Sequence, residues 1–303
     1  MIEFRHLVKE YNGVRAVDDL CLTIGDGEIY GLLGPNGAGK STTILMLIGL
    51  IQPTSGECLV NGVEVSKNPI EVKKQIGYMP EDVGFYTNLD AWQNLEYSAS
   101  FYGLSGEEAD ERIEYLLGLV GLKGVTKKVG GYSKGMRQRL GVAKALINNP
   151  SVVVLDEPTA NLDPQGVSDY RSILRDVAKE GKTILVSSHI LAEVSKVSTK
   201  IGILQRGRLI REGTWEELAN AIGDLNLPEI RINIETRSKM PEFSHPDIVS
   251  ADYRKDGTVA HIVAKSDIRD QLADVLYKNN IAPRQIGLDS ITLEDAILSY
   301  YNE

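Results

Sequence analysis

The sequence predicts an α/β fold with a mixed-sheet core, an antiparallel β subdomain and a helical subdomain, followed by a small α/β module. An apolar run at residues 28–33 leads through a glycine-rich loop into a helical pattern. Two later apolar runs, at 152–155 and 183–187, each follow a helix, as parallel βα units require. Residues 1–30 alternate short apolar runs with turns, which is typical of antiparallel strands.

The first strands flank a turn at Asn12 and Gly13, and residues 59–63 predict a further strand with a tight turn. The two cysteines of the chain, Cys21 and Cys58, stand beside apolar strand residues. We therefore expect both to be buried, reduced thiols, which suits a cytosolic protein.

The loop after residues 28–33 matches the phosphate-binding pattern G-x-x-x-x-G-K-[ST]. It consists of Gly34, Pro35, Asn36, Gly37, Ala38, Gly39, Lys40 and Ser41, and a helix is expected from Thr42 to residue 49. Glycines let backbone N–H groups face phosphate oxygens, and the helix N-terminus adds a favourable dipole for an anion. We expect Lys40 to pair with the β- and γ-phosphates and the Ser41 hydroxyl to bind Mg²⁺.

Helical patterns extend from about residue 90 to 122, and a hairpin at 201–210 closes the first domain. A helix at 215–221 precedes a boundary at 223–228. We expect one domain over residues 1–222, with a helical subdomain at about 85–150, and a C-terminal module over 228–303. In that module we expect strands at 229–236, 258–264 and 284–288, and helices at 267–278 and 293–301.

The composition limits the possible partners. The net charge of −9 argues against a nucleic-acid-binding surface, so no nucleic-acid partner is expected. The first residues lack a signal-peptide pattern, and the longest apolar run, at 44–51, is too short to cross a bilayer. If the protein works at a membrane, another chain must supply the span.

Two acidic residues, Asp156 and Glu157, follow the apolar run at 152–155, which is the Walker B pattern. Asp156 is expected to hold Mg²⁺, and Glu157 to polarise the attacking water as the general base. Asp–Glu pairs are common on protein surfaces, but after four apolar residues both charges are expected at the edge of the core.

Residues 132–138 read Tyr-Ser-Lys-Gly-Met-Arg-Gln and, by themselves, predict a helix start with Ser133 as the N-cap. This segment resembles the signature of ABC ATPases. The phosphate loop, the signature, the Asp156–Glu157 pair, a D-loop at 161–163 and His189 follow one another in the order of that family. The resemblance covers residues 1 to about 222 and marks them as similar to an ABC ATP-binding domain.

The resemblance implies an ATPase that uses ATP and Mg²⁺. It assigns Tyr11, in the turn after the first strand, to stacking on adenine, and His189 to contacts with the γ-phosphate and the attacking water. It also implies that Ser133 and Gly135 bind the γ-phosphate held by a second copy, with Asp163 linking the two sites. The implied assembly is a head-to-tail, ATP-dependent dimer. Without the family context, an exposed turn tyrosine and a structural histidine remain ordinary alternatives.

Residues 77–81, Gly-Tyr-Met-Pro-Glu, align with the Q-loop of the family, but Glu81 stands where glutamine is usual. Glutamine offers a neutral carbonyl to Mg²⁺ and water, whereas glutamate offers a charged oxygen. We expect Glu81 to keep the role with a stronger attraction for the metal. The variant is similar to part of the type-2 exporter branch.

Aromatic residues are concentrated after Glu81. Positions 85–102 hold 6 of the 19 aromatic residues of the chain, namely Phe85, Tyr86, Trp92, Tyr97, Phe101 and Tyr102. Such enrichment is typical of interfaces, and in transporters this region receives a helix of the membrane subunit. We predict that Phe85, Tyr86 and Trp92 line that groove. The alternative interpretation is the core of the helical subdomain.

The signature, the Glu81 variant and the tail at 292–301 together resemble the ATPases of type-2 ABC exporters, which include drug-, sodium- and polysaccharide-export ATPases. The run around Phe85 and the tail are also similar to the ATPase of nitrous-oxide-reductase copper-site assembly. The resemblance implies a transport ATPase, peripheral at the cytoplasmic face of the cell membrane and bound to a separate transmembrane permease.

Two alternatives belong to other functional classes. A soluble ABC ATPase of translation or DNA maintenance usually carries two cassettes or a long coiled coil, whereas this chain has one cassette, no heptad run and an acidic balance. A purely regulatory module could bind ATP without turnover, but the presence of Glu157 and His189 predicts hydrolysis.

Overall fold

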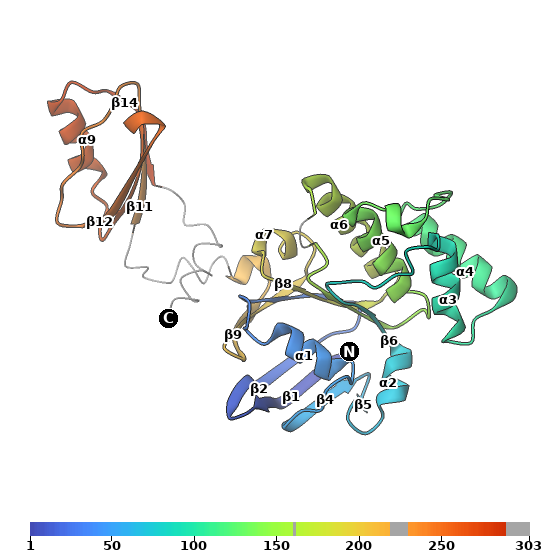
Figure 1. The fold of residues 1–303 in the computed structure, drawn as a ribbon. Coiled ribbons are helices and arrows are strands. Elements are labelled where there is room, and N and C mark those ends of the chain that lie inside the picture. The colour runs from blue at the N-terminus through green and yellow to red at the C-terminus, as the bar shows by residue number, and fades with distance from the viewer. Residues whose placement is uncertain (160–161, 219–229, 289–303) are drawn as a thin grey trace. The chain divides into compact units, whose positions relative to one another are not determined.

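The computed structural model describes residues 1–159, 162–218 and 230–288. The chain divides into two compact units, Met1–Leu218 and Ala219–Glu303 (Figure 1). The expected α/β fold class is confirmed, since the first unit combines a mixed sheet, an antiparallel sheet and a group of helices. No helix among the described residues is long and apolar enough to span a membrane.

The antiparallel sheet of the first unit has the strand order β2-β1-β4-β5. Its strands are β1 (Ile2–Tyr11), β2 (Val14–Ile24), β4 (Ser55–Val60) and β5 (Val63–Glu64). The expected turn at Asn12 and Gly13 joins β1 to β2, and both residues have positive φ, which asparagine and glycine tolerate best.

The central sheet has six strands in the order β10-β9-β3-β8-β7-β6. These are β3 (Ile29–Leu33), β6 (Ile76–Met79), β7 (Val152–Asp156), β8 (Thr183–Ser188), β9 (Lys200–Gln205) and β10 (Arg208–Gly213). All neighbouring pairs are parallel except β9 and β10, which form the expected hairpin. The carboxyl ends of β3, β7 and β8 therefore meet at one edge.

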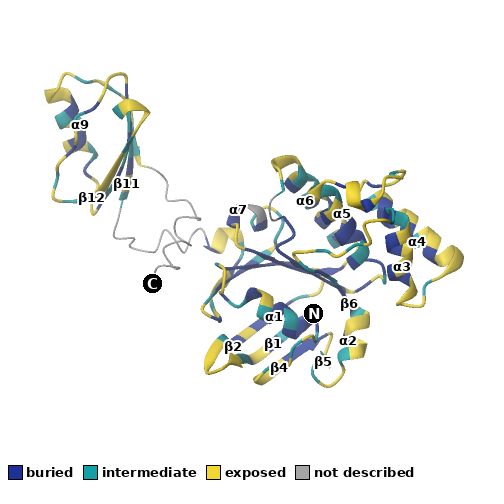
Figure 2. Ribbon diagram, in the orientation of Figure 1, coloured by how far each residue is buried: buried dark blue, intermediate teal, exposed yellow. Residues whose placement is uncertain are grey.

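Helices cover both faces of the central sheet (Figure 1). Helix α1 (Lys40–Leu47) lies between this sheet and the antiparallel sheet, and α6 (Pro164–Lys179) packs on the opposite face. In β7, Val152 and Val154 pack in the hydrophobic core that contains α1, whereas Val153 and Leu155 pack in the core that contains α6. Burial on both faces explains the uninterrupted apolar run of this strand. The strands of the central sheet are largely dark blue in Figure 2.

The helical subdomain contains α3 (Ala91–Ser100), α4 (Gly106–Leu119) and α5 (Lys134–Ala145), with a short 3₁₀ turn at Val129–Gly131. Helix α3 begins with a capping box between Asp90 and Gln93. Two shorter helices are α2 (Pro69–Gln75), which leads from β5 of the antiparallel sheet to β6, and α7 (Leu191–Val194), which connects β8 to β9. Residues 215–218 are also helical.

In the second unit, residues 230–288 form an antiparallel sheet in the order β12-β13-β11-β14 with one helix packed on it. Its elements are β11 (Ile230–Thr236), β12 (Ile248–Arg254), a 3₁₀ turn (Lys255–Gly257), β13 (Val259–Ala264), α9 (Arg269–Lys278) and β14 (Pro283–Leu288). Three strands and one helix match the expected positions, while β12 was not predicted because it lacks an apolar alternation.

Several expectations fall outside the described residues. They are the D-loop residue Asn161, the boundary at 223–228, residues 219–221 of the helix expected at 215–221, and the helix and tail motif expected after residue 291.

One expectation about the thiols is wrong. Cys58 is buried, but Cys21 is exposed, because its position in β2 faces away from the core that Leu20 and Leu22 enter.

Candidate functional site

The phosphate-binding loop connects β3 to α1, as the sequence predicts. Gly39 is the N-cap of α1 with φ of 105°, and a Cβ there would lie 2.4 Å from the carbonyl oxygen of Ala16. Glycine is therefore required by both conformation and space. The helix includes Lys40 and Ser41 in its first turn, so their side chains start at the positive end of the helix dipole.

Lys40 is buried and folds back onto its own loop. Its Nζ donates to the carbonyl oxygens of Gly34 at 2.6 Å and Pro35 at 3.3 Å. The same nitrogen lies 3.2 Å from Oε1 of Glu157. The loop thus holds a desolvated cation close to the carboxylate at the end of β7.

Asp156 and Glu157 stand at the carboxyl end of β7 and are both buried. The Ser187 hydroxyl, from the neighbouring strand β8, donates to Oδ1 of Asp156 at 2.5 Å. The backbone N–H of Glu157 donates to the same hydroxyl at 3.0 Å and to the Ser187 carbonyl at 3.2 Å. One serine therefore fixes the carboxylate of Asp156 and the backbone of Glu157 together.

The carboxylate of Glu157, which follows β7, contacts His189, which follows β8. Its Oε2 lies 2.8 Å from Nδ1 of His189 and accepts the backbone N–H of His189 at 3.3 Å. Glu157 has φ of 47°, a left-handed conformation that is uncommon for residues other than glycine and that is found enriched at functional sites. Lys40 and His189 thus contact different oxygens of one carboxylate.

A cavity of about 580 Å³ brings most of the predicted residues together. It is lined by the following residues: Tyr11, Ala16, Pro35, Asn36, Gly37, Ala38, Gly39, Lys40, Ser41, Thr42, Glu81, Glu157 and His189. Segments separated by up to 178 positions, from Tyr11 to His189, meet here because β1, β3, β7 and β8 end near one another. Asp156 lies below this surface, with Ser187.

Tyr11 and Glu81 lie on the rim of the cavity and are exposed. Tyr11 is the last residue of β1 and pairs with Val14, so its expected place in the turn is corrected by one position. The ammonium of Lys9 lies over its ring, 5.0 Å from the centroid. Glu81 follows β6, and its carbonyl oxygen accepts a hydrogen bond from Gln138 Nε2 of α5 at 3.4 Å.

Among the described residues, Ser133 and Gly135 of the signature and Asp163 of the D-loop do not line this cavity. Ser133 is the N-cap of α5, and its Oγ accepts the N–H of Met136 at 3.2 Å, as the sequence predicts. Asp163 is the N-cap of α6 and accepts the N–H of Gly166 at 2.8 Å. The N-termini of α5 and α6, which hold Ser133, Gly135 and Asp163, therefore lie outside the pocket of their own chain.

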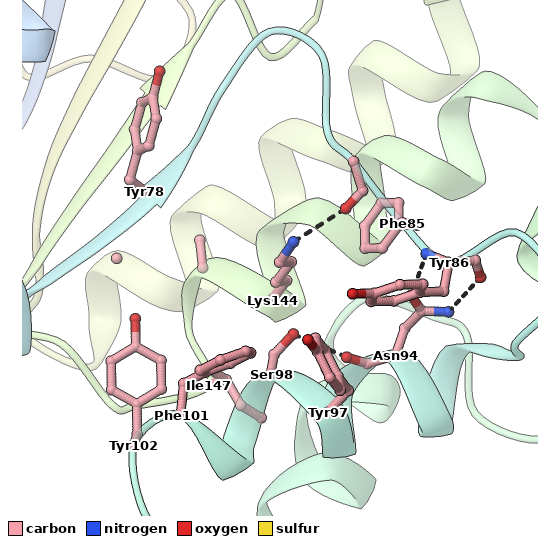
Figure 3. A pocket seen from close by; sticks show the side chains of 13 residues that line it. Tyr78, Phe85, Tyr86, Asn94, Tyr97, Ser98, Phe101, Tyr102, Lys144 and Ile147 are labelled. Carbon is pink, nitrogen blue, oxygen red and sulfur yellow. Dashed lines mark hydrogen bonds between the residues drawn. The ribbon is translucent and has the colours of Figure 1, made fainter. Parts of the chain in front are cut away.

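A second cavity, of about 620 Å³, is lined by several aromatic residues of the helical subdomain, and we call it the aromatic cavity (Figure 3). Tyr86, Tyr97 and Phe101 form a row of edge-to-face contacts with centroid separations of 4.9 and 5.0 Å. At its rim, Lys144 Nζ lies 5.3 Å from the centroid of the Phe85 ring and donates to the Gly84 carbonyl at 3.1 Å. Burial lowers the pKa of Lys144. An exposed apolar row beside one cation is typical of a docking surface.

Of the three residues predicted to line a docking groove, Phe85 and Tyr86 line this cavity and Trp92 does not. The side chains of Phe85 and Trp92 are both partly buried against the core of the helical subdomain, so the alternative interpretation holds for Trp92 and, in part, for Phe85. Tyr78 also lines the cavity. Burial and, less strongly, the Asp156 carboxylate raise the pKa of Tyr78 to about 12, so its hydroxyl stays protonated.

Sequence reasoning missed Ser187, Ala16 and Gln138. Ser187 and Ser188 end an otherwise apolar buried strand, and two polar residues at that point were an available signal. Gln138 is buried and its contact with Glu81 connects residues 57 positions apart, which no local pattern indicates.

Comparison with known proteins places these motifs in a family. A family model described as ABC transporter matches residues 17–160. The bacitracin transport ATP-binding protein BcrA of Bacillus licheniformis is 37% identical over 297 residues, covering 97% of this chain and 95% of the relative. The lantibiotic transport ATP-binding protein SrtF of Streptococcus pyogenes is 38% identical over 231 residues, covering 76% of this chain and 95% of the relative.

A solved structure with a TM-score of 0.65 and 27% identity covers 71% of this chain and 98% of its own. It is a dimeric ATP-binding cassette in a post-hydrolysis state, bound to ADP and Pi.

Proposed function

The chain belongs to the ABC transporter family as an ATP-binding subunit, and we propose how its residues bind ATP, cleave it and transmit the result to a permease. The cavity that contains the phosphate-binding loop, Glu157 and His189 is the nucleotide site. Adenine stacks on Tyr11 at the rim, and the phosphates lie on the loop of residues 34–42. The observation that carries the proposal is the shared contact of Lys40 and His189 with the Glu157 carboxylate.

Glu157 is proposed as the general base. A water oxygen attacks the γ-phosphorus while the bond to the β–γ bridging oxygen breaks, which leaves ADP and phosphate, and Glu157 takes a proton from the water. Lys40 transfers its contact from Glu157 to the β- and γ-phosphates when ATP enters, which frees one carboxylate oxygen for the water. His189, fixed at 2.8 Å from the other oxygen, orients that carboxylate and contacts the γ-phosphate.

The donor set at this site fits Mg²⁺, which prefers oxygen ligands. The Ser41 hydroxyl, the carboxylate of Asp156 and that of Glu81 would hold it, and the ion would neutralise charge on the β- and γ-phosphates. Ser187 keeps Asp156 in place by a charge-assisted hydrogen bond of 2.5 Å.

We propose that two copies associate head to tail around ATP. The N-termini of α5 and α6, at Ser133 and Asp163, are exposed and lie outside the cavity of their own chain. A helix N-terminus with free N–H groups is an anion site, and the γ-phosphate bound to the facing copy is its proposed ligand at Ser133 and Gly135. The solved relative that is dimeric supports the association of two copies.

The aromatic cavity is the proposed contact for a separate transmembrane permease, which would hold the ATPase at the cytoplasmic face of the membrane. Its exposed residues Tyr86, Tyr97 and Phe101 form a continuous apolar row. We further propose export of a peptide antibiotic, because the relative that matches 97% of this chain is named for bacitracin transport and another for lantibiotic transport.

Hydrolysis by the Glu157→Gln variant tests the chemistry. We expect phosphate release to fall by about 10²–10⁴-fold while ATP still binds, because the amide keeps the shape but accepts no proton. Glu107→Gln, at the exposed start of α4, is the matched control and should hydrolyse ATP normally. Near-normal turnover in Glu157→Gln would exclude it as the base.

A further inference from the structure

We propose that His6, Asp19 and Cys21 form a binding site for one Zn²⁺-class cation on the outer face of the antiparallel sheet. One ligand atom from each residue lies within 4.8 Å of the others. The three residues are exposed, and none of them lines the nucleotide cavity or the aromatic cavity. The site is therefore separate from the ATPase chemistry.

The three side chains already contact one another. Nδ1 of His6 lies 2.8 Å from Oδ1 of Asp19 and 3.5 Å from Sγ of Cys21. The backbone N–H of His6 donates to the same sulfur at 3.3 Å, which fixes the position of the thiol. Small rearrangements of exposed side chains are enough to place all three donors around one cation.

Two irregularities in the pairing of β1 and β2 create this cluster. Phe4 pairs with Leu22 and Leu7 with Leu20, so two residues of β1 oppose the single residue Cys21. The next irregularity leaves two residues of β2, including Asp19, opposite one residue of β1. Such β-bulges re-aim side chains, and here His6 and Asp19 both turn outward while the residues that follow them, Leu7 and Leu20, stay in the core.

The backbone at both bulges is left-handed, with φ of 49° at His6 and 57° at Asp19. Histidine, aspartate and asparagine are the residue types that tolerate this conformation best, apart from glycine. The left-handed backbone of the two bulges would be satisfied by asparagine at either position. The combination of imidazole, carboxylate and thiol is what points to a ligand.

The donor set selects the class of metal. Nitrogen, sulfur and carboxylate oxygen are the ligands of zinc, whereas Mg²⁺ and Ca²⁺ prefer oxygen alone. The Cys21 thiol would lose its proton to solvent and bind as thiolate. His6 and Cys21 border a surface hollow of about 470 Å³, which leaves room for water as the fourth ligand.

The surrounding charges leave the site accessible to a cation. Two basic residues border the hollow, Arg5 and Lys200, and each is paired with a carboxylate. Arg5 bonds to Glu3 at 2.6 Å, and Lys200 bonds to Glu212 at 2.7 Å. Their charges are therefore compensated locally rather than directed at the three ligands.

Titration of the metal-free, full-length protein with Co²⁺ and Zn²⁺ tests the proposal. Cobalt bound to a thiolate gives a sulfur-to-metal charge-transfer absorption, and Zn²⁺ should remove this band by displacing cobalt. We expect one Zn²⁺ per chain at this site and a rise in Tm of about 5–10 °C at a hundredfold excess over Kd. The metal braces β1 against β2, so their amide hydrogens should exchange more slowly with Zn²⁺ bound.

Variants assign the ligands. Cys21→Ser should abolish the cobalt band and the rise in Tm, and His6→Asn and Asp19→Asn, which tolerate the same φ, should weaken Zn²⁺ binding by at least about 10–100-fold. The other cysteine of the chain, Cys58, is buried, and burial raises the pKa of its thiol, so Cys58→Ala is the matched control and should keep the band.

Three results would overturn the proposal. They are the absence of a cobalt–thiolate band in the unaltered protein, a band that survives in Cys21→Ser, and equal Zn²⁺ affinity in His6→Asn and the unaltered protein. Because Cys21 is exposed, the metal-free Cys21→Ser protein should unfold at the unaltered Tm, which separates loss of metal from loss of fold.

Discussion

Replacement of Ser187 by alanine should slow ATP hydrolysis with little change in ATP affinity. The Ser187 hydroxyl is fully buried, donates to Asp156 at 2.5 Å and accepts the N–H of Glu157 at 3.0 Å. Alanine removes both bonds and leaves a buried carboxylate without this donor. Hydrogen bonds to charged groups contribute about 1.5–3 kcal/mol, so the free energy of unfolding should fall by about that amount. If the loss of these hydrogen bonds raises the activation free energy of hydrolysis by the same amount, kcat should fall by about 10–100-fold.

Steady-state phosphate release, a nucleotide-binding titration and thermal unfolding together measure these effects. Ser188→Ala is the matched control, since Ser188 is equally buried on the same strand but its hydroxyl bonds to Ile190. A loss of ATP affinity without a loss of kcat in Ser187→Ala would refute the positioning role. Equal losses of kcat in Ser187→Ala and Ser188→Ala would also refute it, because the effect would then result from a general change in β8 and not from the lost contact with Asp156.

Three further predictions concern the two cavities. Lys40→Ala should weaken ATP binding measured by titration, since the phosphates lose their fixed cation, and unchanged affinity would contradict this. Tyr11→Ala should weaken the binding free energy of ATP by about 1–3 kcal/mol while Tyr11→Phe is nearly silent, and equal losses in both would point to the hydroxyl instead of the ring. Tyr86→Glu should abolish permease-stimulated hydrolysis and leave basal hydrolysis intact, whereas joint loss of basal activity and folding would make Tyr86 a core residue.

Much of the fold and the site follows from sequence because their determinants are local. A strand buried on both faces reads as an uninterrupted apolar run, so 152–155 and 183–187 were located to within one residue at each end. The phosphate-binding loop places glycines where positive φ and close backbone contact require them, as at Gly39. Residues at the carboxyl ends of such strands must then meet, which predicts that Glu157 and His189 share a cavity.

The missed features depend on contacts between distant segments. The outward turn of His6 and Asp19 results from pairing irregularities that only the partner strand reveals. The role of Ser187 depends on the register of β8 against β7, which places it beside Asp156. Trp92 faces the core of the helical subdomain rather than the aromatic cavity, since an aromatic-rich sequence does not state which side of a helix each ring occupies.

Sedimentation of the Glu157→Gln protein with ATP and with ADP tests the proposed transport ATPase most directly. Hydrolysis is blocked in this variant, so ATP should stay bound between two copies and shift monomers to dimers by mass action. We predict a monomer without nucleotide or with ADP and a dimer with ATP. Adding Ser133→Arg should block the dimer while each chain still binds ATP, because the N-terminus of α5 can no longer receive the facing γ-phosphate. A dimer that forms without nucleotide, or one that persists in the double variant, would contradict the proposed assembly.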